Sequence, residues 1–120
     1  MTTLAYLRVS KDTQDTKNQR LAILEFARAE RMEVDEFLEL QASSRRSTTI
    51  RKVDLLLAHL VPGDTLVVSE LSRLGRSVGE IITLIDTLVM HHIRVFALKE
   101  GLRLTGAHDL QTTVIVTPSL

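Results

Sequence analysis

The sequence contains no cysteine, and this absence excludes disulfide bonds, thiol catalysis and cysteine-ligated zinc. Aromatic residues make up only 3% of the 120 residues, too few to indicate a surface on which nucleic-acid bases stack. Positive and negative side chains balance at a net charge of +0, so bulk charge gives no support to nucleic-acid binding. What is present, 44% hydrophobic and 25% charged residues, suits one compact globular domain.

Long apolar runs and familiar ligand motifs are also missing. No apolar run approaches the roughly 18 residues that cross a bilayer, and the first residues do not resemble a signal peptide. We therefore expect a cytoplasmic protein with no membrane partner. The sequence has neither Gly-x-x-x-x-Gly-Lys nor Gly-x-Gly-x-x-Gly, and its acids form no recognisable two-metal set. We expect no cofactor, no metal and no small-molecule substrate.

Hydrophobic periodicity predicts strands and helices in alternation. The expected strands span 4–9, 34–40, 65–68 and 93–98, and the expected helices span 19–32, 50–60 and 78–91. Polar stretches between them are expected to be loops, at 10–18, 41–49 and 69–77. This alternation favours an α/β fold, a three-layer domain with a mostly parallel central sheet flanked by helices. In such sheets, functional residues gather at loops that leave the carboxyl ends of strands.

Two pairs of residues in those loops suit phosphate chemistry. Arg8 and Ser10 stand two apart at the end of the first expected strand, so they project to the same side. Arginine stays protonated and grips phosphate through parallel hydrogen bonds, which favours phosphoryl transfer to serine over acyl transfer. Arg73 and Arg76 would share one face of a helical turn and could neutralise a phosphodiester. Taken alone, Arg8 and Ser10 fit a surface cation and a turn cap better than a catalytic pair, whereas Arg73 and Arg76 fit a solvated turn equally well.

Two longer motifs carry a resemblance to a known family. Residues 6–10 (YLRVS) resemble the first signature of serine site-specific recombinases of the resolvase and invertase branch, and residues 69–77 (SELSRLGRS) resemble the second. Residues 63–68 (GDTLVV) precede the second signature at the family's distance. The chain is therefore identified as similar to the N-terminal catalytic domain of this family.

The resemblance implies a reaction and a set of site residues. Ser10 would attack a DNA phosphodiester, forming a 5′-phosphoserine linkage and releasing a 3′ hydroxyl. A partner strand's 3′ hydroxyl would later attack that linkage, so DNA is rejoined without ATP or metal. The remaining members of the implied catalytic set would bind the scissile phosphate or shape the site: Arg8, Arg73, Arg76, Tyr6 and Gln19.

The match departs from the family at two places. The family usually has an aspartate immediately before the first arginine of the second signature, where this chain has Ser72. It also has a DNA-binding arginine ahead of the Gly63-Asp64 pair, and counting back from that pair reaches Ile50. The sequence leaves three candidates for that arginine, the first two preferred: Arg46, Arg51 and Arg45.

Residues 1–120 are expected to form one catalytic domain, truncated before the long dimerisation helix and DNA-binding domain of full members. Pro118 would interrupt a helix continuing from Val114. The expected partners are DNA and further copies of the protein, dimer to tetramer when intact, while the fragment alone is expected to be inactive. One alternative is a catalytically incompetent fragment that acts only as a protein-interaction module. Another is a receiver-like domain, which would need acids where this chain offers arginines.

Strand cleavage by the completed protein should persist in EDTA and without nucleotide, because the sequence offers neither a metal constellation nor a phosphate-binding glycine loop. The measurement is the yield of covalent protein–DNA product on supercoiled plasmid after a long helix and a DNA-binding domain are restored. Strict dependence of the covalent step on magnesium would contradict this mechanism.

Overall fold

A parallel three-stranded unit forms the middle of the sheet. The computed structural model describes residues 2–9, 13–41 and 49–104, with side chains at 2–9, 13–40 and 54–104. Strand β1 (Thr3–Val9) pairs in parallel with β2 (Glu36–Gln41) on one side and with β3 (Thr65–Val68) on the other. These three strands lie within two residues of the positions predicted from the sequence.

Two further strands complete the sheet beyond β3. Strand β4 (Arg94–Ala97) is parallel to β3, and β5 (Leu102–Leu104) returns antiparallel to β4, giving the order β2-β1-β3-β4-β5. The mostly parallel sheet is confirmed. Strand β5 was not predicted, because three residues carry too short a pattern to register as a strand. The turn into it contains Gly101 at a φ of 64°, in the left-handed region that favours glycine.

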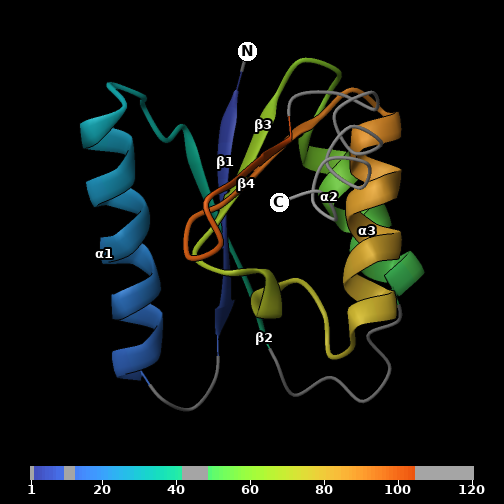
Figure 1. Cartoon of the computed structure of the whole chain (residues 1–120), viewed down its shortest axis with the longest axis horizontal. Helices are drawn as coiled ribbons and strands as arrows, with labels where there is room; N and C mark the ends of the chain where they lie inside the picture. The colour runs from blue at the N-terminus through green and yellow to red at the C-terminus, as the bar shows by residue number, and fades with distance from the viewer. Residues whose placement is uncertain (1, 10–12, 42–48, 105–120) are drawn as a thin grey trace, which may run out of the picture.

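Helices cover both faces of the sheet, which confirms the predicted three-layer arrangement. Helix α1 (Thr13–Ala29) lies on one face, and α2 (Thr49–His59) and α3 (Val78–Met90) lie together on the other (Figure 1). The predicted loop over 10–18 is wrong from Thr13 onward, because α1 begins there. Residues 13–18 are polar and include a first-turn acid, Asp15, which suits the positive end of the helix dipole. Their polarity resembles that of a loop although their backbone is helical.

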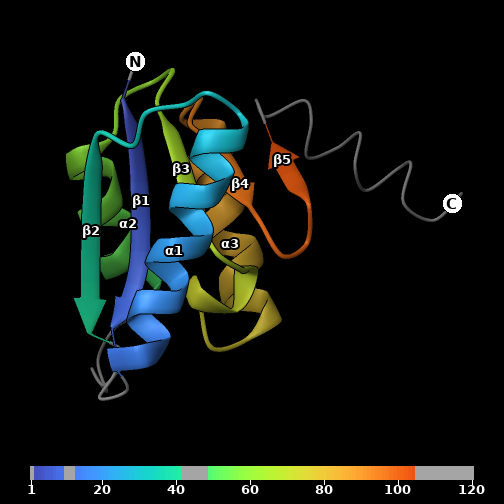
Figure 2. The ribbon, with the colours of Figure 1, turned by 90° about the vertical axis from the view of Figure 1, so that its left-hand side faces the viewer.

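The core is divided by the sheet into two layers. Alternation along β1 sends Leu4 and Tyr6 toward α2 and α3, and sends Ala5 and Leu7 toward α1. On the α1 side, Ile23 packs against the sheet with no exposed surface. Figure 2 shows α1 crossing the front of β1 and β3, with its first turn near the carboxyl end of β1.

A buried carboxylate fastens the opposite edge of the sheet. Asp64 is 3% exposed, and its two oxygens accept hydrogen bonds from the backbone N–H groups of Thr2, at 2.8 Å, and Val61, at 2.9 Å. Burial alone would raise the pKa of Asp64, but these bonds outweigh it and hold that pKa below its usual value. Asp64 thus ties the start of β1 to the turn before β3.

Replacement of Asp64 by alanine should destabilise the fold by about 1.5–3 kcal/mol at neutral pH, since two backbone donors lose a charged acceptor. The pKa of Asp64 is lowered on folding, so this contribution exists above the unfolded value of 3.8 and disappears as pH falls through the lower folded value. Urea unfolding at pH 7 and in acid measures both effects. Asp86→Ala, at an exposed position of α3, is the control. Equal midpoints for the two variants at pH 7 would refute the role of Asp64.

Candidate functional site

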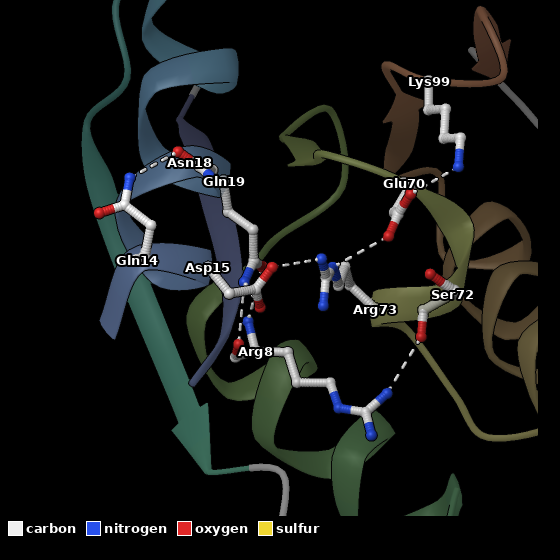
Figure 3. A network of polar contacts seen from close by, with 9 residues as sticks. All are labelled: Arg8, Gln14, Asp15, Asn18, Gln19, Glu70, Ser72, Arg73 and Lys99. Atoms are coloured by element: carbon white, nitrogen blue, oxygen red, sulfur yellow. Dashed lines mark hydrogen bonds and ion pairs between the residues drawn. The ribbon is translucent and has the colours of Figure 1, made fainter. Parts of the chain in front are cut away.

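The candidate site lies where β1 and β3 end at the same edge of the sheet. The two strands are parallel and their register ends with Tyr6 beside Val68. The segment that follows β3 contains a single-turn 3₁₀ helix, η1 (Leu71–Arg73), and lies next to the end of β1 and the first turns of α1 (Figure 3). This edge therefore brings together residues 6–9 of the first motif and the second motif, although they are about sixty residues apart in the chain.

The side chain of Gln19 holds the end of β1 by bonding to the main chain of Arg8. Strand β3 pairs with β1 only as far as Tyr6, and Arg8 lies beyond that pairing. The side-chain oxygen of Gln19 accepts a hydrogen bond from the Arg8 N–H at 3.1 Å, and its nitrogen donates to the Arg8 carbonyl at 2.9 Å. Gln19 is 2% exposed, so this amide is a fixed part of the interior. An amide is suited to the position because it both donates and accepts.

Arg8 reaches from β1 to the segment after β3. Its Nη1 donates to the backbone carbonyl of Ser72 at 3.1 Å (Figure 3). Ser72 is the position at which the family usually has an aspartate. The contact uses the main chain of Ser72, so the guanidinium of Arg8 meets a carbonyl dipole and not a carboxylate there.

Arg73 lies between two carboxylates. Its Nη2 is 2.7 Å from an oxygen of Asp15, and its Nε is 3.2 Å from an oxygen of Glu70. The other oxygen of Asp15 accepts a hydrogen bond from the Gln19 amide at 3.1 Å, so Asp15 joins Arg73 to the Gln19–Arg8 contact. One connected network therefore fixes Arg8 and Arg73 relative to each other.

Glu70 is held in its ionised form. A hydrogen bond from the Ser72 hydroxyl lowers its pKa most, partial burial opposes that effect, and Lys99 and Arg73 lower the pKa further. The Lys99 ammonium is 3.3 Å from the second oxygen of Glu70. The carboxylate thus stays charged at neutral pH and forms an ion pair on the Nε side of Arg73, although the buried Nε itself makes no hydrogen bond to any described residue.

Tyr6 lies beneath the site on the same face of β1 as Arg8. It is 1% exposed, and burial raises its pKa to about 12, with a smaller opposing effect from the positive charge of Arg8. Its phenol therefore stays neutral at physiological pH. It can shape the floor of the site but it is not a ready source of phenolate.

Arg76 lies on an exposed turn that leads into α3. The prediction that Arg73 and Arg76 share a helical face is wrong, because η1 ends at Arg73 and α3 begins only at Val78. The Arg76 N–H donates to the Glu80 carboxylate at 2.9 Å, and the Ser77 hydroxyl accepts from the Glu80 N–H at 3.2 Å. The Ser77 bond caps α3, and the Glu80 bond fixes the backbone that presents Arg76.

Several predicted site residues lie outside the described part of the chain. Ser10 is the residue next to Val9 in the sequence, but it is not one of the residues that the structure describes. The same holds for Arg45 and Arg46. Arg51 belongs to α2 by its backbone, and its side chain is not described. Their roles stay predictions.

Three functional candidates were missed by sequence reasoning: Asp15, Glu70 and Lys99. Asp15 stands four residues before Gln19 and Glu70 three before Arg73, spacings that pair side chains on a helical turn. That signal was hidden for Asp15 because its segment was predicted to be a loop. Lys99 carries no local signal, since only the fold brings it to Glu70.

The described residues contain no group of three or more His, Asp or Glu side chains placed to hold a metal ion. Within the same ranges, no helix is both long and apolar enough to cross a membrane.

Fold and site together define a mostly parallel α/β domain that gathers arginine side chains at the carboxyl edge of its sheet. The family model described as "Resolvase, N terminal domain" matches residues 3–116. The chain therefore belongs to the resolvase family through this N-terminal domain, and the resemblance inferred from the two signature motifs is confirmed.

Curated relatives agree with this assignment. The chain is 36% identical over 117 residues to the Transposon Tn2501 resolvase of Escherichia coli, covering 94% of this chain and 58% of that protein. It is 30% identical over 103 residues to the Transposon Tn501 resolvase of Pseudomonas aeruginosa, covering 86% of this chain and 50% of that protein. The chain thus spans between half and three fifths of the length of these two relatives.

Solved structures share the fold. The N-terminal catalytic domain of TP901-1 integrase superposes with a TM-score of 0.67 at 20% identity, covering 98% of this chain and 92% of that one. A resolvase family site-specific recombinase from Streptococcus pneumoniae superposes with a TM-score of 0.64 at 15% identity, covering 99% of this chain and 89% of that one. At these identities the likeness establishes the architecture alone.

Replacement of Gly75 by alanine should destabilise the domain and disturb the turn that carries Arg76. A Cβ at Gly75 would lie 3.0 Å from the Glu80 Cβ and 3.2 Å from the Ile81 Cγ1, so these neighbours must move by a few tenths of an ångström, and we expect a cost of about 1–3 kcal/mol. Gly79→Ala is the matched control, because its Cβ meets only the Ser77 hydroxyl at 4.0 Å and alanine favours the helix. Urea unfolding compares them. A Gly75→Ala midpoint equal to that of Gly79→Ala would contradict the close packing.

Proposed function

We propose that this chain is the catalytic domain of a site-specific recombinase that cleaves and rejoins DNA through a covalent bond between Ser10 and a 5′ phosphate. The observation that carries the proposal is the network that fixes Arg8 and Arg73 at one edge of the sheet. In the sequence, Ser10 lies directly between the end of β1 and the start of α1, the two elements that this network joins.

The chemistry follows from what arginines can supply. A guanidinium does not act as a base at neutral pH, but it neutralises phosphate oxygens and stabilises the charge that develops as phosphorus gains a fifth ligand. In the proposed step, a bond forms between the Ser10 oxygen and phosphorus while the bond from phosphorus to the 3′ oxygen breaks. The serine proton is lost to solvent or a nearby acceptor, and the 3′ oxygen leaves as a hydroxyl. Reversal by another 3′ hydroxyl rejoins DNA and frees Ser10.

The rest of the reaction is expected to need more than this domain. The curated relatives are longer than the region they share with this chain. We propose that sequence choice on DNA and assembly of several copies depend on such additional segments, since phosphate contacts give affinity without specifying sequence. The proposed setting is the cytoplasm, where DNA is accessible.

Replacement of Arg73 by lysine should slow formation of the covalent product by about a hundredfold to a thousandfold, because lysine lacks the planar fork that grips two phosphate oxygens. The assay joins this chain to the remaining part of the Tn2501 resolvase. It measures protein–DNA adduct on a plasmid carrying that resolvase's site.

Arg20→Lys is the matched control, since Arg20 pairs with Glu39 at 2.7 Å, the same distance as Arg73 and Asp15, but away from the site. It should cleave normally, and Ser10→Ala should form no adduct. Near-normal cleavage by Arg73→Lys would remove Arg73 from the phosphate site.

A further inference from the structure

The connection between Asp15 and Arg73 has a consequence for how DNA gains access to the site. A phosphate can be bound bidentately by an arginine either through Nη1 and Nη2 or through Nε and Nη2. Both faces include Nη2, the atom that lies 2.7 Å from Asp15. The Nε end of the second face lies 3.2 Å from Glu70. The Nε atom is buried and makes no hydrogen bond within the described ranges, so Glu70 is an ion-pair neighbour of Arg73 and does not occupy that donor. The Asp15 oxygen does accept a hydrogen bond from Nη2, the atom that both faces share, and it therefore stands at a position that a phosphate oxygen would use.

The two carboxylates are held by different elements, and each has a second partner, since Asp15 also accepts a hydrogen bond from Gln19 at 3.1 Å. Glu70 belongs to the same turn as Arg73, and its second oxygen is bound by Lys99 at 3.3 Å. The Ser72 hydroxyl also bonds to Glu70 and keeps its pKa low. Asp15 comes from a different layer, in the first turn of α1, and meets Arg73 across 58 positions of sequence. Glu70 is thus built into the arginine's own turn, whereas Asp15 approaches from outside it.

Charge balance also singles out Asp15. The network contains the cations Arg8, Arg73 and Lys99 and the anions Asp15 and Glu70 (Figure 3). If Asp15 withdraws, a phosphate monoanion restores the same balance at the same guanidinium. The pair is partly exposed, with 24% of the Arg73 side chain and 26% of the Asp15 side chain accessible to solvent. Solvent, and therefore a phosphate in solution, can reach both partners of the pair.

We propose that Asp15 is an internal competitor of the DNA phosphate at Arg73, and that Glu70 keeps the guanidinium oriented when Asp15 withdraws. The inference rests on the proposed function, because it assumes that Arg73 binds phosphate. Asp15 is then a regulatory contact of the resting site, and Glu70 is a positioning residue. When phosphate replaces Asp15 at Arg73, the contact between α1 and the segment after β3 is also lost, because Asp15 joins Gln19 to Arg73.

The test titrates the 120-residue chain with inorganic phosphate and follows the Nε–H signal of Arg73 by NMR, assigned by its loss in Arg73→Lys. Asp15→Asn keeps an oxygen that accepts from Gln19 but removes the competing charge. It should tighten phosphate binding at Arg73 by about fivefold, the amount expected for loss of a partly exposed ion pair. Glu39→Gln is the matched control, since it removes the 2.7 Å pair with Arg20, and it should leave the affinity unchanged.

A second variant and a double-mutant cycle separate this inference from its premise. Asp15→Ser should act as Asp15→Asn does, and Glu70→Gln should broaden or shift the Arg73 signal even without phosphate, because orientation is lost. In an Arg73→Lys background, Asp15→Asn should change global phosphate binding by less than twofold. Unchanged or weaker binding in Asp15→Asn, with phosphate still bound at Arg73 in the unsubstituted chain, would overturn the competitor role alone. Absence of phosphate at Arg73 in every variant would overturn the phosphate site of the proposed function as well.

Discussion

The double hydrogen bond between the Gln19 side chain and the main chain of Arg8 is the contact on which the site depends. A parallel strand that runs beyond its neighbour leaves main-chain donors and acceptors without a partner, and burying them unpaired is costly. Gln19 supplies one donor and one acceptor at that point, from a helix that packs on the sheet through Ile23. The main chain of Arg8 therefore has a partner on both sides, β2 on one and Gln19 on the other.

Electrostatics extends this anchor across the edge of the sheet. Gln19 also bonds to Asp15, and Asp15 pairs with Arg73, so a neutral amide inside the protein connects to a charged pair near the surface. Arginines grouped for phosphate binding would repel each other without DNA. The acids beside them lower that cost in the resting state. A chain of zero net charge can thus carry a local cationic site.

The sequence predicted the parts of the molecule whose signal is local. Strand β3 was correct to the residue because Thr65 and the three apolar side chains that follow it are all buried. Helix α3 was predicted to within one residue because its apolar positions repeat with helical spacing. The first turn of α1 was missed because its polar residues resemble a loop. Gln19 was found only through resemblance to a family, and Asp15 not at all, because its significance lies in a partner 58 residues away that only the fold brings near.

The central claim concerns the atom that joins protein to DNA. The most direct measurement traps the covalent product on DNA, digests protein and DNA, and locates the remaining nucleotide by tandem mass spectrometry. The account predicts a nucleotide attached through its 5′ phosphate to the peptide that contains Ser10, with a free 3′ hydroxyl on the other DNA end. A nucleotide attached to any other residue, or cleaved DNA with a free 5′ phosphate and no attached protein, would contradict it.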